Sequence, residues 1–386
     1  MPLRPNSQSG GAGLLKLHEY LLRRLLLTIF VLLAISVITF SITRGLLPPA
    51  TALTGYLRLG ETDQTKLSIA QAVGVATKSC PSFSAFLNSQ KGCVVPLWDQ
   101  YFYWLVDVSK GDWGYSNLPP TAATAPTLTI FAERFPYTLQ LAMASAALTI
   151  LVGFFLGIIS ATRANRVPDH LSRLSAIVGY SIPAFWFGFI LQIAVVLYLA
   201  VRGFPLLPVS GALGTGCALC VANPGQIGTY TTIPLFDSLL SGNLAYFWDT
   251  LLAMILPAIT LSIVPIAILS RILRSSMIEA LSQDYILLAR SKGLRDWVVI
   301  YRHALRNAIL PAITACGLIF ASFLGGVVVV EYVFTYPGIG AAALAASRNL
   351  DINFLELDVL VSALIIVVAN LIVDVLYVYL DPRIRY

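Results

Sequence analysis

The sequence predicts an all-α protein, a bundle of six transmembrane helices with a long extracytoplasmic insertion. Hydrophobic residues make up 57% of the 386 residues and charged residues only 11%, whereas soluble domains hold about 45–50% and 25%. The mean hydropathy is +0.80. The apolar residues also gather in six runs, each close to the roughly 20 residues that a helix needs to cross the hydrocarbon core. A soluble chain of this length has too little interior for so much apolar surface, whereas lipid is a matching solvent.

The first apolar run, 25–42, follows Arg23 and Arg24 and has no clear small-residue cleavage site. We therefore expect an uncleaved first span after a cytoplasmic N-terminus of residues 1–24. The transmembrane core is expected at 138–380, with spans near 138–160, 174–201, 250–270, 311–334 and 357–380, and residues 381–386 form a tail. Because backbone groups in lipid must bond within their own segment, the spans are helices.

The distribution of charge predicts that both termini lie inside the cell. The formal net charge is +6, and most lysines and arginines fall in the segments that this orientation places inside, as the positive-inside rule requires. The remaining segments hold more acidic than basic residues. Because the basic residues flank apolar runs instead of covering a polar surface, the bilayer is the expected partner and nucleic acid is not.

Two long extracytoplasmic loops are predicted, at 43–137 and 202–249. The first carries an aromatic cluster at 98–104, and two interpretations fit it equally: an interfacial helix near 97–108, or rings that pack the loop onto the bundle. Four cysteines lie in these loops, where disulfides are stable: Cys80, Cys93, Cys217 and Cys220. Of the three pairings, the local one (80 with 93, 217 with 220) needs least rearrangement. All histidines are predicted inside, so no metal site is expected.

The cytoplasmic loop 271–310 has the pattern helix, glycine turn, helix. Apolar residues three and four apart predict a helix over 277–290. Gly293 follows it and is suited to the left-handed conformation that closes a last turn. A second helical pattern runs from Trp297 to Leu305, before Pro311. Three interpretations stay open on physical grounds: binding to anionic lipid, insertion into a groove of a partner, or a solvated hairpin that only sets topology.

Short motifs occur in order along the whole chain. Three lie in the inner loop, at 284–285, 289–294 and 303–311, and the others are 23–24, 111–116, 333–340, 370–374 and 380–385. Together they resemble dipeptide/oligopeptide ABC transporter permease subunits, and the inner-loop segments are similar to that family's variant "EAA" loop. The glutamate of sugar-permease relatives is missing at 287–289, which is usual for peptide-type members. The cysteine-bearing parts of the outer loops look longer than is typical.

The resemblance implies the ABC type I importer permease fold and a translocating subunit without enzymatic activity. It implies as partners a second homologous permease subunit, two ATPase subunits and an extracytoplasmic substrate-binding protein. The chain has no Gly-x-x-x-x-Gly-Lys-Ser/Thr segment to cradle phosphate, so we expect it to bind no cofactor, with ATP and Mg on the partner ATPases. The residues that the resemblance assigns to ATPase coupling are Asp284, Tyr285, Ala289, Arg290, Ser291, Lys292, Gly293, Leu294, Arg295, His303, Arg306 and Asn307.

Four polar residues lie in or near the predicted spans: Gln140, Gln192, Asn370 and Asp374. Intramembrane polar groups are candidates for a substrate pathway. For Asp374 the favoured alternative is that it bonds a neighbouring helix or the inner loop. Peptides are the solute that the resemblance favours, although nickel, haem and glycosides use similar permeases. A secondary transporter is the less favoured class, because the sequence shows no clear internal repeat. A membrane enzyme is also less favoured, because no histidine falls within a span.

Overall fold

The computed structural model describes residues 9–53, 55–57, 61–118, 125–213, 220, 225 and 228–380. These form two compact units: unit 1 comprises Met1–Ile130 and Ala346–Tyr386, and unit 2 comprises Phe131–Ala345. The described residues are mostly helical, with one two-stranded sheet. Within the described part of the chain, five helices are long and apolar enough to cross a membrane, and a bent pair of helices is a sixth candidate.

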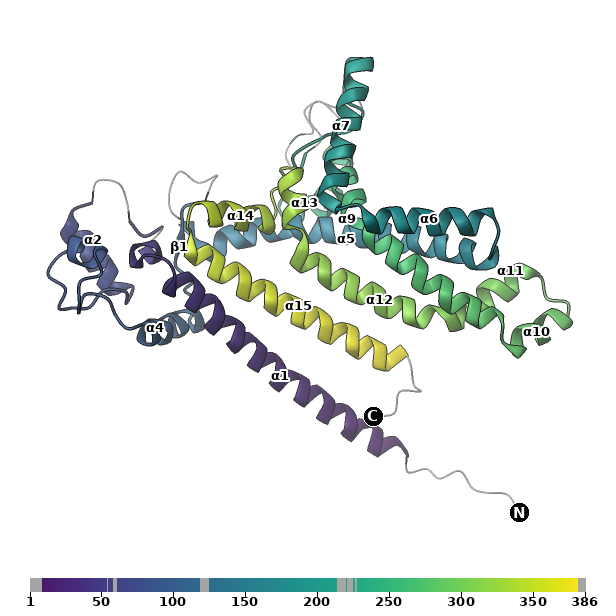
Figure 1. Cartoon of the computed structure of the whole chain (residues 1–386), viewed down its shortest axis with the longest axis horizontal. Coiled ribbons are helices and arrows are strands. Elements are labelled where there is room, and N and C mark those ends of the chain that lie inside the picture. Colours follow the sequence, from purple (N-terminus) through teal and green to yellow (C-terminus); the bar gives the residue numbers. More distant parts are fainter. Residues whose placement is uncertain are drawn as a thin grey trace. The chain divides into compact units, whose positions relative to one another are not determined.

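Unit 1 is built on the first and last long helices, α1 (Ser9–Gly45) and α15 (Ile352–Leu380), which run side by side (Figure 1). Near the end of α1, the Arg44 guanidinium donates to both carboxylate oxygens of Glu356, with Nε 3.0 Å from Oε1, and Thr43 Oγ1 donates to the same carboxylate at 2.8 Å. Both charged side chains are almost fully buried. The pair neutralises two charges that would be costly if left alone in an apolar environment.

The outer part of unit 1 has its own small apolar core. It contains the short helix η1 (Pro49–Leu53), α2 (Asp63–Ala72) and α3 (Phe83–Leu87). Leu53, Ala70 and Phe86 are buried together with a disulfide between Cys80 and Cys93. The disulfide closes this small core as the local pairing predicts. Cys217, on which the second predicted pair depends, lies outside the described residues.

The Cys80–Cys93 bond spans 13 residues, and closing a loop of that size contributes about 3 kcal/mol in the chain-entropy description. We therefore expect Cys93→Ser to destabilise the outer core by about 3 kcal/mol and to expose 63–95 to protease. Alkylation with and without reductant, followed by mass spectrometry, measures the bond. Cys316→Ser, which removes the free, half-buried thiol of unit 2, is the matched control. A freely alkylated Cys80 in the unreduced protein would contradict the prediction.

Each interpretation of the aromatic cluster describes a different side of α4 (Leu97–Ser109). Tyr101 is buried, its hydroxyl lies 2.8 Å from Ser36 Oγ, and its ring contacts Phe40 edge-on with centroids 5.3 Å apart. The opposite side exposes Trp98 and Phe102 by more than half of their surface. The helix therefore packs onto α1 through one face and presents rings outward through the other.

The segment 111–116 forms a turn that leads into β1 (Tyr115–Ser116), which pairs antiparallel with β2 (Ala125–Pro126). Asp112 Oδ1 accepts from Gly114 N at 2.9 Å, and Gly114 has a positive φ of 75°. Ser116 Oγ donates to Asp351 Oδ2 at 2.6 Å. Burial raises the pKa of the Asp351 carboxyl, against the lowering effect of its hydrogen bonds. The segment 111–116 is thus bonded to the residue that precedes α15 in unit 1.

Unit 2 is organised around α9 (Leu244–Leu281), which contacts α6 (Val167–Ser181), α7 (Ala184–Arg202), α8 (Pro234–Leu240) and α12 (Leu305–Gly326). Helix α5 (Thr127–Thr162) enters this unit and approaches α9 closely at two glycines. A Cβ on Gly153 would lie 2.9 Å from Leu269 Cδ2, and one on Gly157 would lie 2.9 Å from Leu273 Cβ. The small residues therefore serve helix packing.

Three predicted helices differ from the structure. The span expected at 174–201 is broken between α6 and α7, which meet at 104°, because Pro183 lacks a backbone N–H and Ile182 before it is extended. The span expected at 311–334 ends at Gly326, the second of two adjacent glycines, and α13 (Val328–Val333) is a separate helix. The helix expected at 277–290 is interrupted because Gln283 is extended. Helix α14 (Ile339–Arg348) follows α13.

Candidate functional site

A helical hairpin lies beyond the ends of α9 and α12 (Figure 1). It comprises α10 (Asp284–Ser291), α11 (Asp296–Val298) and the π-helix η2 (Val299–Ala304), which continues into α12. One side of α10 is buried: Ile286 is 2% and Ala289 6% exposed. These side chains belong to one apolar cluster with Met277 of α9 and with Val299 and Ala304 of η2. The hairpin is therefore packed onto both long helices.

The other side of the hairpin exposes large apolar side chains, which we call the coupling face. Its members are Leu287, Leu288, Leu294, Trp297 and Tyr301. Leu287 is 67% and Trp297 68% exposed, and the rings of Trp297 and Tyr301 stack at a tilt with centroids 5.4 Å apart. Exposed basic side chains surround this face: Arg290, Lys292, Arg295, Arg302 and Arg306. A contiguous apolar patch with a charged rim is typical of a protein-binding surface.

The turn between α10 and α11 depends on glycine. Gly293 has φ +74°, and its N–H donates to Arg290 O at 2.9 Å, while Leu294 N donates to Ala289 O at 3.4 Å. Apart from the two neighbouring residues, a Cβ added to Gly293 would meet no atom of the described residues within 4 Å. The glycine turn predicted from the sequence is therefore present, and the space beside it is open.

The π-helix is the part of the hairpin that sequence reasoning missed. Val299 and Ala304 are fully buried at its two ends, and the element contacts α9, α10 and α12. His303 is half-buried, and its carbonyl accepts from Asn307 Nδ2 at 3.1 Å. No residue type marks a π-turn in a sequence, although such turns are frequent at functional sites.

The residues assigned to coupling divide into two groups. Most are exposed on the hairpin: Asp284, Tyr285, Arg290, Ser291, Lys292, Gly293, Leu294, Arg295, Arg306 and Asn307. Ala289 differs, because it faces α9 and η2 and has almost no accessible surface. Its position suits it to holding α10 in place and not to touching a partner directly.

Two of the predicted pathway residues are held by partners within unit 2. Gln140 donates through Nε2 to the Tyr336 hydroxyl and accepts from Leu235 N at 3.3 Å. Gln192 Nε2 donates to the carbonyl oxygens of Val209 at 2.7 Å and Val333 at 3.0 Å. These amides therefore bond neighbouring segments of unit 2. In α15, Asn370 is half-buried, and the side chain of Asp374 lies outside the described residues.

A buried carboxylate that sequence reasoning missed holds the segment after α13. Glu331 is fully buried and accepts from Thr138 Oγ1 at 2.6 Å and from Ala341 N at 3.0 Å. A Cβ on Gly338 would overlap this carboxylate, and one on Gly340 would lie 2.5 Å from Val328 Cα. Both glycines of the segment 333–340 are therefore required by close packing.

A second buried carboxylate joins α5, α6 and α9. Asp169 has no exposed surface and accepts from Arg274 Nε at 2.7 Å and Nη2 at 2.9 Å. Arg173 Nη2 at 3.0 Å, Ser160 Oγ at 2.5 Å and Asn165 N at 2.8 Å complete its bonding. This cluster lies in the part of unit 2 from which α9 continues toward the hairpin.

The architecture defines a multi-pass membrane component with an exposed apolar hairpin, and comparison with known proteins specifies the family. The family model described as "Binding-protein-dependent transport system inner membrane component" matches residues 153–386. Over 374 residues the chain is 35% identical to the dipeptide transport system permease protein DppB of Alkalihalophilus pseudofirmus, covering 95% of this chain and 99% of that protein. The chain therefore belongs to the family of binding-protein-dependent transport system inner membrane components.

Other relatives agree with this assignment. The chain is 36% identical to the dipeptide transport system permease protein DppB of Escherichia coli, covering 79% of this chain and 86% of that protein. It is 32% identical to the oligopeptide transport system permease protein AppB of Bacillus subtilis, covering 95% of this chain and 99% of that protein. The family relationship extends across the outer insertion in the relatives that cover nearly the whole chain.

Proposed function

We propose that this chain is the translocating permease subunit of an ATP-driven importer of dipeptides or oligopeptides, and that its coupling face docks into the ATPase subunits. The observation that supports this most strongly is the combination of family membership with an exposed apolar face on a hairpin that is packed onto α9 and α12. The full-length relatives carry dipeptide and oligopeptide transport in their names, which favours peptides over nickel, haem or glycosides.

The packing provides a path for mechanical coupling. When the ATPase subunits close, they displace the hairpin, and Ile286 and Ala289 transmit the displacement to Met277 in α9 and to Val299 in η2. Helix α9 runs without interruption from Leu244 to Leu281, so movement at its inner end reaches the outer end of unit 2. Such rigid-body movement of helices is a recognised means of switching between two arrangements.

The proposal includes the partners and the orientation that the sequence predicts. ATP and Mg are bound by two ATPase subunits, a second homologous permease completes the pathway, and an extracytoplasmic binding protein delivers the solute. Both termini and the coupling face lie in the cytoplasm of a cell whose inner or plasma membrane the chain spans. The asymmetry of basic residues supports this orientation.

The orientation is tested at Ser291, an exposed residue of the hairpin. Ser291→Cys in a Cys316→Ser background is treated with a membrane-impermeant maleimide, in intact cells and in inverted membrane vesicles. We expect labelling in the vesicles alone, because the hairpin is cytoplasmic. Labelling in intact cells would overturn the orientation and with it the docking of an ATPase.

Docking is tested at Trp297. Trp297→Ala is expected to weaken co-purification of the ATPase subunits by about 30-fold, the effect of losing one interface hot spot of about 2 kcal/mol. The variant should stay folded, because 68% of this side chain is exposed. Trp186→Ala removes a comparably exposed indole from α7 and should leave co-purification unchanged. Equal ATPase recovery with both variants would contradict the docking role.

The solute is tested by uptake. Cells that express the complete transporter should accumulate a labelled dipeptide, and unlabelled dipeptides or oligopeptides should compete in excess. Nickel, haem and glycosides should not compete. Competition by one of these three and not by peptides would replace the substrate and leave the coupling role intact.

A further inference from the structure

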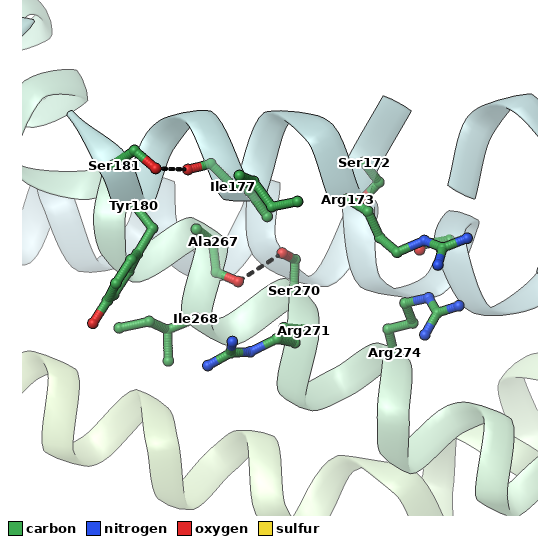
Figure 2. A pocket seen from close by; sticks show the side chains of 12 residues that line it. Ser172, Arg173, Ile177, Tyr180, Ser181, Ala267, Ile268, Ser270, Arg271 and Arg274 are labelled. Carbon is green, nitrogen blue, oxygen red and sulfur yellow. Dashed lines mark hydrogen bonds between the residues drawn. The ribbon is translucent and has the colours of Figure 1, made fainter. Parts of the chain in front are cut away.

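A pocket of about 360 Å³ lies between α6 and α9, on the part of unit 2 that carries the Asp169 cluster. Three arginines line it: Arg173 from α6, and Arg271 and Arg274 from α9. Figure 2 shows the guanidinium groups of Arg173 and Arg274 at one end of the pocket, and that of Arg271 near Tyr180 and Ile268 at the other. The pocket thus holds arginine side chains along its length, beside apolar side chains such as Ile177 and Ile268.

The pocket carries an excess of positive charge. Arg274 and Arg173 share the single carboxylate of Asp169. Arg271 is exposed and, among the residues that the structure describes, has no carboxylate within salt-bridge distance. Three guanidinium groups against one carboxylate favour the binding of an anion.

A second cavity adjoins the pocket. This cavity, of about 280 Å³, shares Ala176, Ala267 and Ser270 with the first. It extends to Leu156 of α5 and to Ile263 and Ile266 of α9, which precede the arginines of α9 by one to three turns. Burial of an acyl chain in such an apolar extension is favourable, whereas an inorganic anion or a free nucleotide has no acyl chain to bury there.

We propose that the two joined cavities bind an anionic phospholipid, with its phosphate between Arg173 and Arg271 and one acyl chain against Ala176, Ile263 and Ile266. The inference rests on the orientation proposed above, which places these arginines at the cytoplasmic surface of the membrane. Basic pockets between transmembrane helices on that side suit anionic headgroups. The site is separate from the coupling face, so a bound lipid would brace α6 against α9 without occupying the ATPase surface.

The experiment uses the purified complete transporter in nanodiscs of phosphatidylcholine with or without one-fifth phosphatidylglycerol. Lipid retained after exchange into detergent is measured by native mass spectrometry. Arg271→Gln is expected to reduce retention of phosphatidylglycerol about fivefold, the contribution of one arginine at an anionic membrane surface. Arg163→Gln, which removes an exposed arginine from the same side outside the pocket, is the matched control and should retain the lipid as the native protein does.

A second variant tests the apolar cavity without changing the charge of the protein. Ala176→Phe fills the junction of the two cavities and is expected to reduce retention of phosphatidylglycerol as strongly as Arg271→Gln does. Unchanged retention in both variants would overturn the proposal. Displacement of the lipid by millimolar inorganic phosphate would overturn it in favour of a simple anion site, and displacement by a transported peptide would assign the pocket to the translocation pathway. None of these results changes ATPase docking, so the proposed function is judged separately.

Discussion

Gly293→Asp is expected to reduce solute uptake at least about tenfold while the chain still folds and enters the membrane. The turn has room for a side chain, because a Cβ at this position would meet no atom of the described residues within 4 Å, apart from the two neighbouring residues. The φ of +74° costs an ordinary residue about 1–2 kcal/mol, and aspartate is among the residues that accept this conformation best. The loss of uptake is therefore expected to come from the partner surface. Uptake of labelled peptide and membrane abundance are measured together.

Two further substitutions separate the backbone from the interface. Gly293→Ala adds the smallest side chain but opposes the left-handed conformation, whereas Gly293→Asn is bulkier and adopts that conformation readily. If an ATPase subunit packs against this turn, asparagine is expected to impair uptake more than alanine. The reverse order would show that Gly293 serves only to end α10. Normal uptake with all three variants would remove the turn from the coupling mechanism.

Asp169→Asn is expected to destabilise the permease by about 3–5 kcal/mol, the cost of breaking a buried ion pair. The carboxylate has no exposed surface and bonds two arginines, a hydroxyl and a backbone N–H. An asparagine replaces one acceptor oxygen by a donor NH₂ that would face Arg274 or Ser160. Thermal unfolding in detergent and the fraction recovered as a monodisperse peak measure the effect.

The arginine partners provide the controls. Arg173 is 43% exposed, so Arg173→Gln should cost about 1 kcal/mol or less. Arg274→Gln leaves a buried carboxylate without its main partner, and adding Asp169→Asn to it should recover part of the loss. An Asp169→Asn variant as stable as the native protein would show that the cluster does not hold α5, α6 and α9 together.

Hydropathy was sufficient to predict the class of fold, because lipid requires long apolar helices and leaves few alternatives. It was not sufficient for helix continuity. The bend before Pro183 follows from local backbone chemistry, but the 104° angle depends on packing that hydropathy does not encode. The end of α12 at Gly326 had a signal in its two adjacent glycines, yet the apolar residues that follow concealed it.

The hairpin likewise combines features that could be predicted from the sequence with features that could not. Gly293 was predictable because only a left-handed residue closes a helix so tightly. The buried side of α10 was not, because nothing in the sequence distinguishes Ala289 from its neighbours, and only the structure shows Ile286 and Val299 in the same apolar cluster. Glu331 and Asp169 were overlooked because single acidic residues carry no spacing pattern, and only the fold reveals that each is enclosed by donors.

The ion pair between Arg44 and Glu356 sets an order for biogenesis. Its partners are 312 residues apart, so at a synthesis rate of about 5–20 residues per second the arginine emerges roughly 15–60 s before its carboxylate exists. During that interval the first helix carries a charge without its final counter-ion and is free to be held by the insertion machinery. Unit 1 is therefore completed after unit 2 during synthesis. A chain truncated before Glu356 lacks the carboxylate that pairs with Arg44 of the first helix.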